Sequence, residues 1–124
     1  MSSRMDTGIY DYALNVPVVS GVPYVGLPVA LYGAMGFSVH CVLTNGAAGT
    51  SVCQVTNFGQ DLVPPGGIPW SQLSSDTLAA NAMKYNGYSA SQVGEAFARF
   101  ARFVFTPSAS GNLYYAVNVR RLSA

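Results

Sequence analysis

Hydrophobic and polar residues alternate along two pairs of short runs, as they do in β-strands that bury one face. The first pair covers 37–43 and 50–55, and the segment 45–49 between them is rich in Asn, Gly and Ala, which suit a turn. This pattern predicts a β-hairpin. Its apolar face consists of Phe37, Val39, Cys41, Leu43, Cys53 and Val55. Antiparallel pairing that keeps these side chains together places Cys41 opposite Cys53.

A second alternating pair covers 100–106 and 113–122, on either side of a turn-forming segment at 107–111. Pairing Phe105 with Leu113 gives a common core face that consists of Ala101, Phe103, Phe105, Leu113, Tyr115 and Val117. The opposite face carries Phe100, Arg102, Val104, Tyr114, Ala116 and Asn118. Aromatic residues and arginine are enriched at protein interfaces, so this second face is expected to serve assembly.

Short apolar pieces separated by Pro17, Pro23 and Pro28 fill the segment 16–32. Proline has no amide proton to donate within a central strand, so the segment is predicted to be an extended arm or a set of edge strands. An apolar extended segment needs a surface to lie on. Its own sheet and a neighbouring subunit are both possible surfaces.

The segment 61–70 is a predicted loop around two prolines and two glycines, with Trp70 at its far end. A short helix is expected to begin at 74–76, where Ser and Asp can cap it, and to end at Asn86 and Gly87. Its packed face would consist of Leu78, Ala82 and Tyr85. The segment 89–96 fits a helical turn and a loop equally well.

Together these elements predict a mainly β protein: an antiparallel, jelly-roll-like β-sandwich with one short helix and a Pro-rich N-terminal arm. The 124 residues suit a single domain, 1–124. Within it, 1–35 would form the extended arm or edge strands and 36–124 the sandwich core.

Charged residues make up only 9% of the chain, against about 25% in ordinary soluble domains, and the net charge is +1. High hydrophobicity excludes a disordered chain, and the near-zero net charge argues against a nucleic-acid partner. The segment 15–60 contains no Asp, Glu, Lys or Arg. Such a surface is rarely left facing water, so we expect neighbouring subunits to cover this region more than its own fold does.

The first residues lack the apolar core of a signal peptide, and no apolar run reaches the roughly 18 residues of a membrane span. We therefore expect no signal peptide and no membrane partner. The two cysteines, Cys41 and Cys53, are too few for a disulfide framework, and His40 is the single histidine. Buried thiols are favoured over a disulfide, and no metal or other cofactor is expected.

Catalytic chemistry is not apparent in the sequence. His40 and Cys41 are adjacent in a predicted strand, so they point to opposite faces and cannot form a nucleophilic pair. No spacing singles out a pair of carboxylates, and Gly66 and Gly67 precede no phosphate-binding Lys or Ser. We therefore expect the protein not to be an enzyme.

Arginines concentrate in the last 30 residues, which contain Arg99, Arg102, Arg120 and Arg121 but a single acidic residue, Glu95. The cluster fits a basic assembly patch or an ordinary solvated strand end. The candidate assembly residues of the chain are Val18, Val22, Tyr24, Val25, Leu27, Tyr32, Arg102, Tyr114, Arg120 and Arg121.

The hairpin at 39–55, the loop that holds Trp70 and the terminal pair 101–105 and 110–119 resemble small jelly-roll-type β-sandwich proteins of tailed-phage virions, including head decoration or cement proteins. The resemblance covers about residues 36–122. It implies a non-enzymatic virion structural protein, assembled in the host cytoplasm. Its partners would be the major capsid protein or other virion subunits and its own copies in a homo-oligomer.

A carbohydrate-binding or adhesion module of the β-sandwich type is the alternative function. Its sugar-stacking residues would be Trp70, Tyr85 and Tyr88. Trp70 fits better as a buried anchor of the loop, because large aromatic residues are mostly buried and pair their polar atom when they are.

Overall fold

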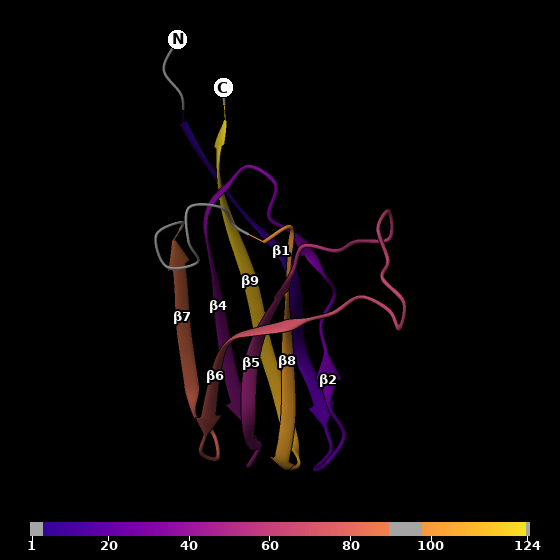
Figure 1. Cartoon of the computed structure of the whole chain (residues 1–124). Coiled ribbons are helices and arrows are strands. Elements are labelled where there is room, and N and C mark those ends of the chain that lie inside the picture. Colours follow the sequence, from indigo (N-terminus) through magenta and orange to yellow (C-terminus); the bar gives the residue numbers. More distant parts are fainter. Residues whose placement is uncertain (1–3, 90–97, 124) are drawn as a thin grey trace.

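The computed structural model describes residues 4–89 and 98–123, which form two antiparallel sheets (Figure 1). The first sheet contains, in spatial order, β1 (Arg4–Val18), β9 (Gly111–Ser123), β4 (Ala34–Thr44) and β7 (Met83–Ser89). The second sheet contains β2 (Tyr24–Val25), β8 (Phe100–Ala109), β5 (Ala48–Thr56) and β6 (Ser71–Leu78), and β3 (Val29–Ala30) also pairs with β8. This arrangement confirms the mainly β, antiparallel prediction.

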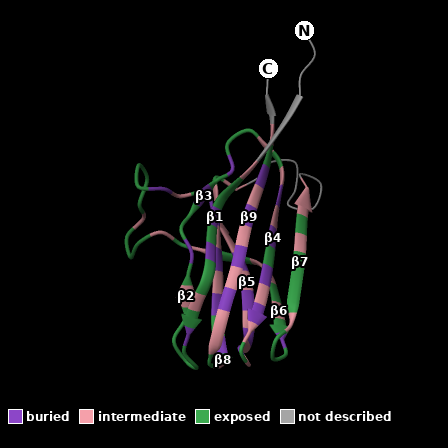
Figure 2. Cartoon of the chain, turned by 180° about the vertical axis from the view of Figure 1, so that it is seen from behind, coloured by how far each residue is buried: buried purple, intermediate pink, exposed green. Residues whose placement is uncertain are grey.

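The core lies between the sheets because each long strand has one apolar face (Figure 2). The rings of Phe103 in β8 and Tyr115 in β9 stack across it with centroids 4.3 Å apart. The largest fully buried side chains are Phe103, Phe105, Leu43, Leu113, Val117, Val119 and Cys41. Both core faces predicted from the alternation are therefore buried, apart from Val55, which is half-buried.

The pairing predicted for the first alternating runs is wrong. β4 and β5 belong to different sheets, so Cys41 lies opposite Lys84 and Tyr115, whereas Cys53 lies opposite Ser74 and Phe103. The turn residues were recognised correctly, and Asn45 has a positive φ of 55°. The turn nevertheless carries the chain across the core instead of along one sheet, because two inward faces can also bury each other by facing across a sandwich.

The terminal pair shows the same difference. β8 and β9 do not pair: Phe105 lies opposite Tyr24 and Ser51, and Leu113 lies opposite Val16 and Leu43. The face expected to serve assembly is consequently divided. Phe100, Arg102 and Val104 lie in the second sheet, and Tyr114, Ala116 and Asn118 lie in the first.

The helix predicted between 74 and 87 is wrong, and no helix occurs among the residues that the structure describes. β6 and β7 occupy this segment, joined by a turn in which the Ala82 amide donates to the Ala79 carbonyl and Asn81 has a φ of 60°. β6 pairs with β5 and β7 pairs with β4. These edge positions in two sheets override the local helix preference of an alanine-rich stretch.

The N-terminal segment forms edge strands on the chain's own sheets, not a free arm. β1 pairs with β9 along its length, and β2 and β3 both pair with β8. Pro17 lies in the edge strand β1, and Pro23 and Pro28 directly precede β2 and β3. The sequence allowed the segment to lie on the chain's own sheet or on a neighbouring subunit. In the structure it lies on the chain's own sheets. Of the segment 89–96, Ser89 ends β7 and the remainder lies outside the described residues.

Candidate functional site

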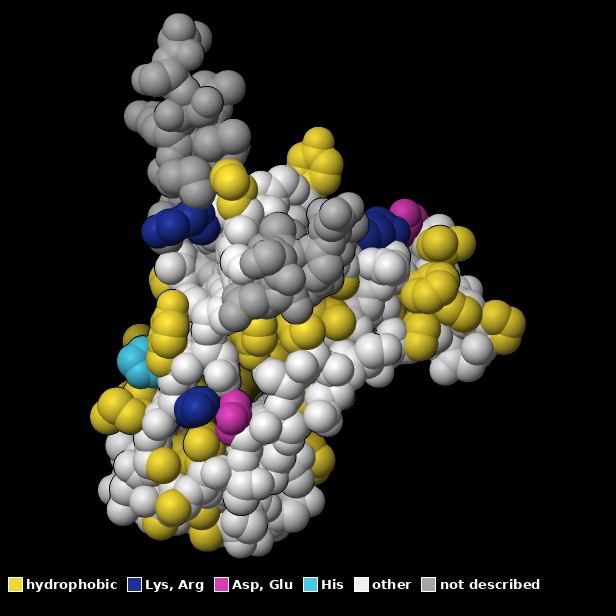
Figure 3. Space-filling model, turned by 60° about the vertical axis from the view of Figure 1, so that its left-hand side comes forward, with side chains coloured by type: hydrophobic (Ala, Val, Ile, Leu, Met, Phe, Trp, Pro, Cys, Tyr) yellow, Lys and Arg dark blue, Asp and Glu magenta, His cyan; other side chains and the backbone are white. Residues whose placement is uncertain are grey.

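The outward face of the first sheet divides into an apolar half and a polar half. Strand register places Ala116 between Tyr12 and His40, and it places His40 opposite Tyr85. One step along the strands, Val42 lies between Tyr114 and Met83. We define the apolar half as Tyr12, Leu14, His40, Val42, Met83, Tyr85, Tyr114 and Ala116. Hydrophobic side chains surround the histidine in the space-filling view (Figure 3).

Several members of the apolar half are highly exposed: Leu14 is 72% and Met83 is 66% accessible. A depression of about 160 Å³ lies among them, lined by Leu14, His40, Val42, Tyr114, Tyr115 and Ala116. The His40 and Tyr85 rings meet edge to face with centroids 5.9 Å apart. This half contains no Asp, Glu, Lys or Arg, as expected for a surface that a partner covers.

The polar half is hollowed because small residues lie at its outward positions. Ser38 lies opposite Gly87 and Asn118, and Gly36 lies opposite Ser89 and Arg120. The resulting cavity, which we call the polar hollow, measures about 260 Å³. It is lined by Met35, Gly36, Phe37, Ser38, Tyr85, Gly87, Tyr88, Ser89, Asn118 and Arg120.

Asn118 is exceptional within the polar hollow. Its side-chain oxygen is buried and accepts no hydrogen bond, the one such side-chain atom found in the described part of the chain. Leaving a buried acceptor unpaired costs about 1–3 kcal/mol. Native proteins rarely retain such a group without a structural or functional reason.

The outward face of the second sheet is mostly polar and its large groups are paired. Thr50 lies between Thr77 and Thr106. The Arg102 Nε–H donates to the Gln54 side-chain oxygen at 2.8 Å, and its guanidinium carbon lies 4.2 Å from the centre of the Trp70 ring. Desolvation lowers the pKa of Arg102, which still leaves it charged at neutral pH.

A long loop, residues 57–70, projects away from both sheets (Figure 1). Arg99 holds its base: the guanidinium forms an ion pair with Asp61 at 3.2 Å, and the Arg99 amide donates to the Asn57 side chain. Beyond this anchor the loop exposes Leu62 and Val63 to solvent. Beyond Asp61, residues 62–70 contain no charged side chain and form a second apolar surface.

The candidate assembly residues fall into separate groups. Val22, Val25, Leu27 and Tyr32 are exposed along the path from β1 to β4. Val18 belongs to the buried core, and Tyr24 packs against it. Such exposed valines and leucines fit a contact surface, and the buried Val18 does not.

The remaining candidates have different roles. Tyr114 lies in the apolar half and Arg120 lines the polar hollow. Arg121 is an internal brace whose guanidinium donates to the carbonyl oxygens of Ala30 and Tyr32. Arg102 lies on the opposite face of the molecule, over Trp70.

Of the three candidate sugar-stacking residues, Tyr85 and Tyr88 both line the polar hollow, whereas Trp70 lies on the opposite face of the molecule. Trp70 lies half-buried beneath Arg102 at the end of the 57–70 loop, not in the core. Tyr85 is on the outward face of the first sheet. Tyr88 points inward, where it stacks on Phe37 with ring centroids 4.7 Å apart and shares a hydrogen bond with the Ser74 hydroxyl.

A hydrogen-bonded cluster that sequence reasoning missed closes one edge of the core. The Tyr115 hydroxyl donates to the Asp11 carboxylate at 2.5 Å, and the Tyr24 hydroxyl lies 3.3 Å from the Tyr115 hydroxyl. Burial and the Asp11 carboxylate raise the pKa of Tyr115. The cluster joins β1 and β9 to β2. Recognising 4–18 as a strand would not have revealed the cluster, because alternation places the larger apolar residues Tyr10, Tyr12 and Leu14 on the face opposite to Asp11 and so favours an outward Asp11.

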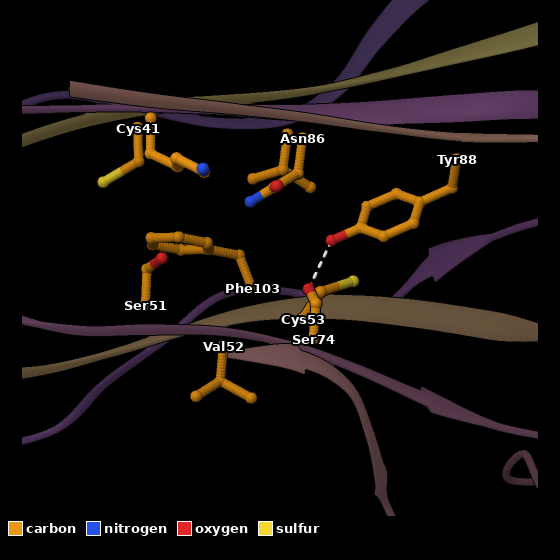
Figure 4. A pocket seen from close by; sticks show the side chains of 10 residues that line it. Cys41, Ser51, Val52, Cys53, Ser74, Asn86, Tyr88 and Phe103 are labelled. Carbon is orange, nitrogen blue, oxygen red and sulfur yellow. Dashed lines mark hydrogen bonds between the residues drawn. The ribbon is translucent and has the colours of Figure 1, made fainter. Parts of the chain in front are cut away.

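The two cysteines are buried free thiols on facing sheets. They line a cavity of about 10 Å³, room for one water molecule, together with Ser51, Phe103 and Tyr88 (Figure 4). Burial raises the pKa of each thiol to about 12. Among residues 4–89 and 98–123, no group of His, Cys, Asp and Glu has a metal-binding arrangement, and no helix is long and apolar enough to cross a membrane.

Comparison with known proteins adds information on the fold. No family model matches the sequence, and no curated protein matches it significantly. One solved structure similar to this chain is described as "Bacillus endospore appendages form a novel family of disulfide-linked pili". The TM-score is 0.53 at 7% sequence identity, over 99% of this chain and 90% of that chain. The similarity therefore extends over the β-rich fold of the entire chain.

Proposed function

We propose that this protein is a non-enzymatic structural subunit of a multi-copy assembly. The observation that carries the proposal is the exposed, uncharged apolar half on the outward face of the first sheet. A sheet face of this kind loses unfavourable contact with water when a second protein surface covers it. The projecting 57–70 loop offers a further apolar surface on a different side of the same chain. Two unlike contact surfaces on one subunit suit head-to-tail assembly.

The similar fold of a pilus protein supports this class of function. That protein is described as forming disulfide-linked pili. In the present chain both cysteines are buried and their pKa values are raised, so they are unsuited to link folded subunits. The proposed contacts between copies are therefore non-covalent.

The strand order supports a jelly-roll description of the sandwich. β1, β4, β7 and β9 lie in one sheet, and β2, β5, β6 and β8 lie in the other, so most connections cross between the sheets. Jelly rolls, in which the chain crosses repeatedly between two packed sheets, occur in viral capsid and lectin domains. The fold alone does not assign either role.

Capsid decoration is the finer form of the proposal. In that form the protein is located in the virion, binds the major capsid protein and contacts its own copies. Its support is the resemblance of the alternating segments to jelly-roll proteins of tailed-phage virions. The exposed apolar half supports contact with some protein surface, and a capsid lattice is one such surface.

Sedimentation velocity of the purified protein, combined with electron microscopy, tests the proposal. We expect oligomers or filaments whose size increases with protein concentration. A protein that stays monomeric alone but binds purified capsids would favour decoration over self-assembly. A compact monomer at high concentration that also fails to bind capsids would contradict both forms.

A further inference from the structure

We infer that the polar hollow binds an acidic monosaccharide, such as a hexuronic acid at the end of a glycan. This site goes beyond a structural role; of the three candidate sugar-stacking residues it uses Tyr85 as its aromatic wall, and it does not include Trp70. Three features of the hollow carry the inference: its size, its aromatic wall and its polar groups.

The volume of the hollow suits one sugar ring. At about 260 Å³ it lies just below the roughly 300–1,000 Å³ of pockets that hold drug-sized ligands. Gly36, Ser38 and Gly87 keep its floor low, because none has a side chain larger than a hydroxymethyl group. A Cβ at Gly36 would lie 2.9 Å from the Tyr88 carbonyl oxygen, so the close approach of β4 and β7 at this point requires glycine.

Tyr85 supplies an aromatic wall. Its side chain is 62% exposed, and it leans over Gly87, where an added Cβ would lie 3.3 Å from the Tyr85 hydroxyl. The His40 ring supports it edge-on from the apolar half. An exposed aromatic ring with a polar tip can contact the apolar C–H face of a sugar and hydrogen-bond a hydroxyl group.

Arg120 gives the hollow its preference for an acid. It is exposed, and among the described residues it takes part in no hydrogen bond or ion pair. By contrast, Arg99, Arg102 and Arg121 all have partners within the chain. A guanidinium group binds a carboxylate through two parallel hydrogen bonds, so a free one in a small hollow selects a carboxylated ligand.

The remaining polar groups suit hydroxyls. The Asn118 amide has a buried oxygen without a donor, and the Ser38 hydroxyl lies in the adjacent register position. Amide and hydroxyl groups both donate and accept, as sugar hydroxyls require. If the Asn118 side chain turns toward the hollow, its oxygen can accept a hydrogen bond from a sugar hydroxyl, a partner that the described chain does not provide.

A segment of a second copy is a less suitable occupant. Asp61 is the acidic residue of the projecting 57–70 loop, and its carboxylate is already paired with Arg99. Asp76 is paired with Lys84 and Asn86, and Asp11 is buried. These three described carboxylates are therefore less available to Arg120 than a free sugar acid.

Protein-observed NMR titration tests the site, at a protein concentration below that at which copies associate. The probes are glucuronate, glucose as the neutral match, and an oligosaccharide that ends in glucuronate. We expect amide shifts at Ser38, Gly87 and Asn118, and affinity for glucuronate roughly tenfold higher than for glucose. Arg120→Gln should remove that preference, and Tyr85→Ala should weaken binding of every probe. The control Tyr12→Ala, on the apolar half, should bind like the wild type.

Several outcomes would overturn the inference. No shift with any probe at about 10 mM would exclude a sugar site of useful affinity. Equal affinity for glucuronate and glucose would remove the assigned role of Arg120. Shifts at these residues that follow protein concentration and not sugar would show that the hollow is a contact between copies. The supporting result is different: Arg120→Gln should assemble to the same extent as the wild type and lose only the sugar preference, which separates this site from the proposed function.

Discussion

The two outward faces of the sandwich are both made by antiparallel strands. They differ in whether their polar side chains have partners within the chain and in how many apolar side chains they expose. On the second sheet, threonines lie side by side, and Arg102 is paired with Gln54 and Trp70. On the first sheet, Leu14 and Met83 remain exposed, and Arg120 and the Asn118 oxygen lack partners among the described residues. A face whose polar groups are paired within the chain has little need of a further contact, so we propose the first sheet as the face that binds a partner or ligand.

This difference also shows where the low content of charged residues affects the surface of the protein. The uncharged segment 15–60 supplies β4 and β5, one strand for each sheet. Inward residues of both strands are covered by the chain's own core. Only outward groups of β4, with neighbours from β1, β7 and β9, form the exposed apolar half. We therefore propose that neighbouring subunits cover this apolar half and the exposed connections near it, not the segment 15–60 as a whole.

A substitution in the core between the two sheets should lower the free energy of unfolding more than any other change considered. Phe103→Ala removes a ring that is 1% exposed and stacks on Tyr115, so both faces should lose their support. We expect the free energy of unfolding to fall by about 3–5 kcal/mol in chemical denaturation. Val25→Ala, at an exposed position, should change it by less than about 0.5 kcal/mol. Equal effects of both variants would mean that the sheets do not pack on each other through Phe103.

The buried thiols should make the protein sensitive to alkali. Ionisation of an unfolded thiol begins near its ordinary pKa of 9.0, whereas burial raises the pKa to about 12 for Cys41 and Cys53. The folded state is therefore fully favoured below pH 9 and loses stability as the pH rises from 9 to 12. At pH 10 the loss should be about 1.4 kcal/mol for each thiol.

Denaturation midpoints between pH 8 and 11 measure this loss. Cys41→Ala and Cys53→Ala should each flatten the decline, although both lower stability at neutral pH. Thiol alkylation of the folded protein at pH 8 should be slow, and unfolding should accelerate it. Rapid alkylation of the native protein would show that the thiols are accessible to linkage between subunits.

A matched pair of valines compares the two faces directly. Val42 and Val52 are both half-buried, and each points outward from the middle of its own sheet. Val42→Lys places a charge in the apolar half, so we expect self-association to weaken by roughly tenfold or more. Val52→Lys should leave it near the wild-type value. Sedimentation equilibrium gives both constants, and loss of association in Val52→Lys alone would move the contact to the other face.

Apart from the control Val25→Ala, the smallest effect on stability is expected for a substitution on the outward face of the second sheet. Arg102→Gln removes the guanidinium from the Trp70 ring, a contact worth about 0.5–1 kcal/mol. Because Trp70 is the single tryptophan, its fluorescence reports the change as a shift to longer wavelength. Self-association should be unaffected. A large loss of assembly in Arg102→Gln would make the second sheet a contact surface after all.

The sequence alternation predicted which side chains are buried but not which strands pair. Phe103 and Tyr115 were correctly placed on one core face, yet they meet across the sandwich and not within one sheet. Alternation specifies only the inward direction, which is the same for a hairpin and for a connection that crosses the core. The turn residues near Asn45 and Gly111 are compatible with both.

The helix prediction failed for a related reason. Local capping and propensity favour a helix at 74–84, but β5 and β4 each present a free edge that β6 and β7 occupy. The polar hollow could not be predicted from the sequence either, because Ser38, Gly87 and Asn118 become neighbours only through that long-range strand pairing. Tyr85 and Arg120 were both singled out from the sequence, but for separate roles.

Hydroxyl-radical footprinting of the wild-type protein, below and above the concentration at which it assembles, tests the central claim most directly. If the outward face of the first sheet is the covered surface, oxidation of Tyr12 and Tyr114 should fall on assembly, while oxidation of Val52 and Val104 on the outward face of the second sheet stays constant. Protection of Val52 and Val104 with unchanged oxidation of Tyr12 and Tyr114 would contradict the claim.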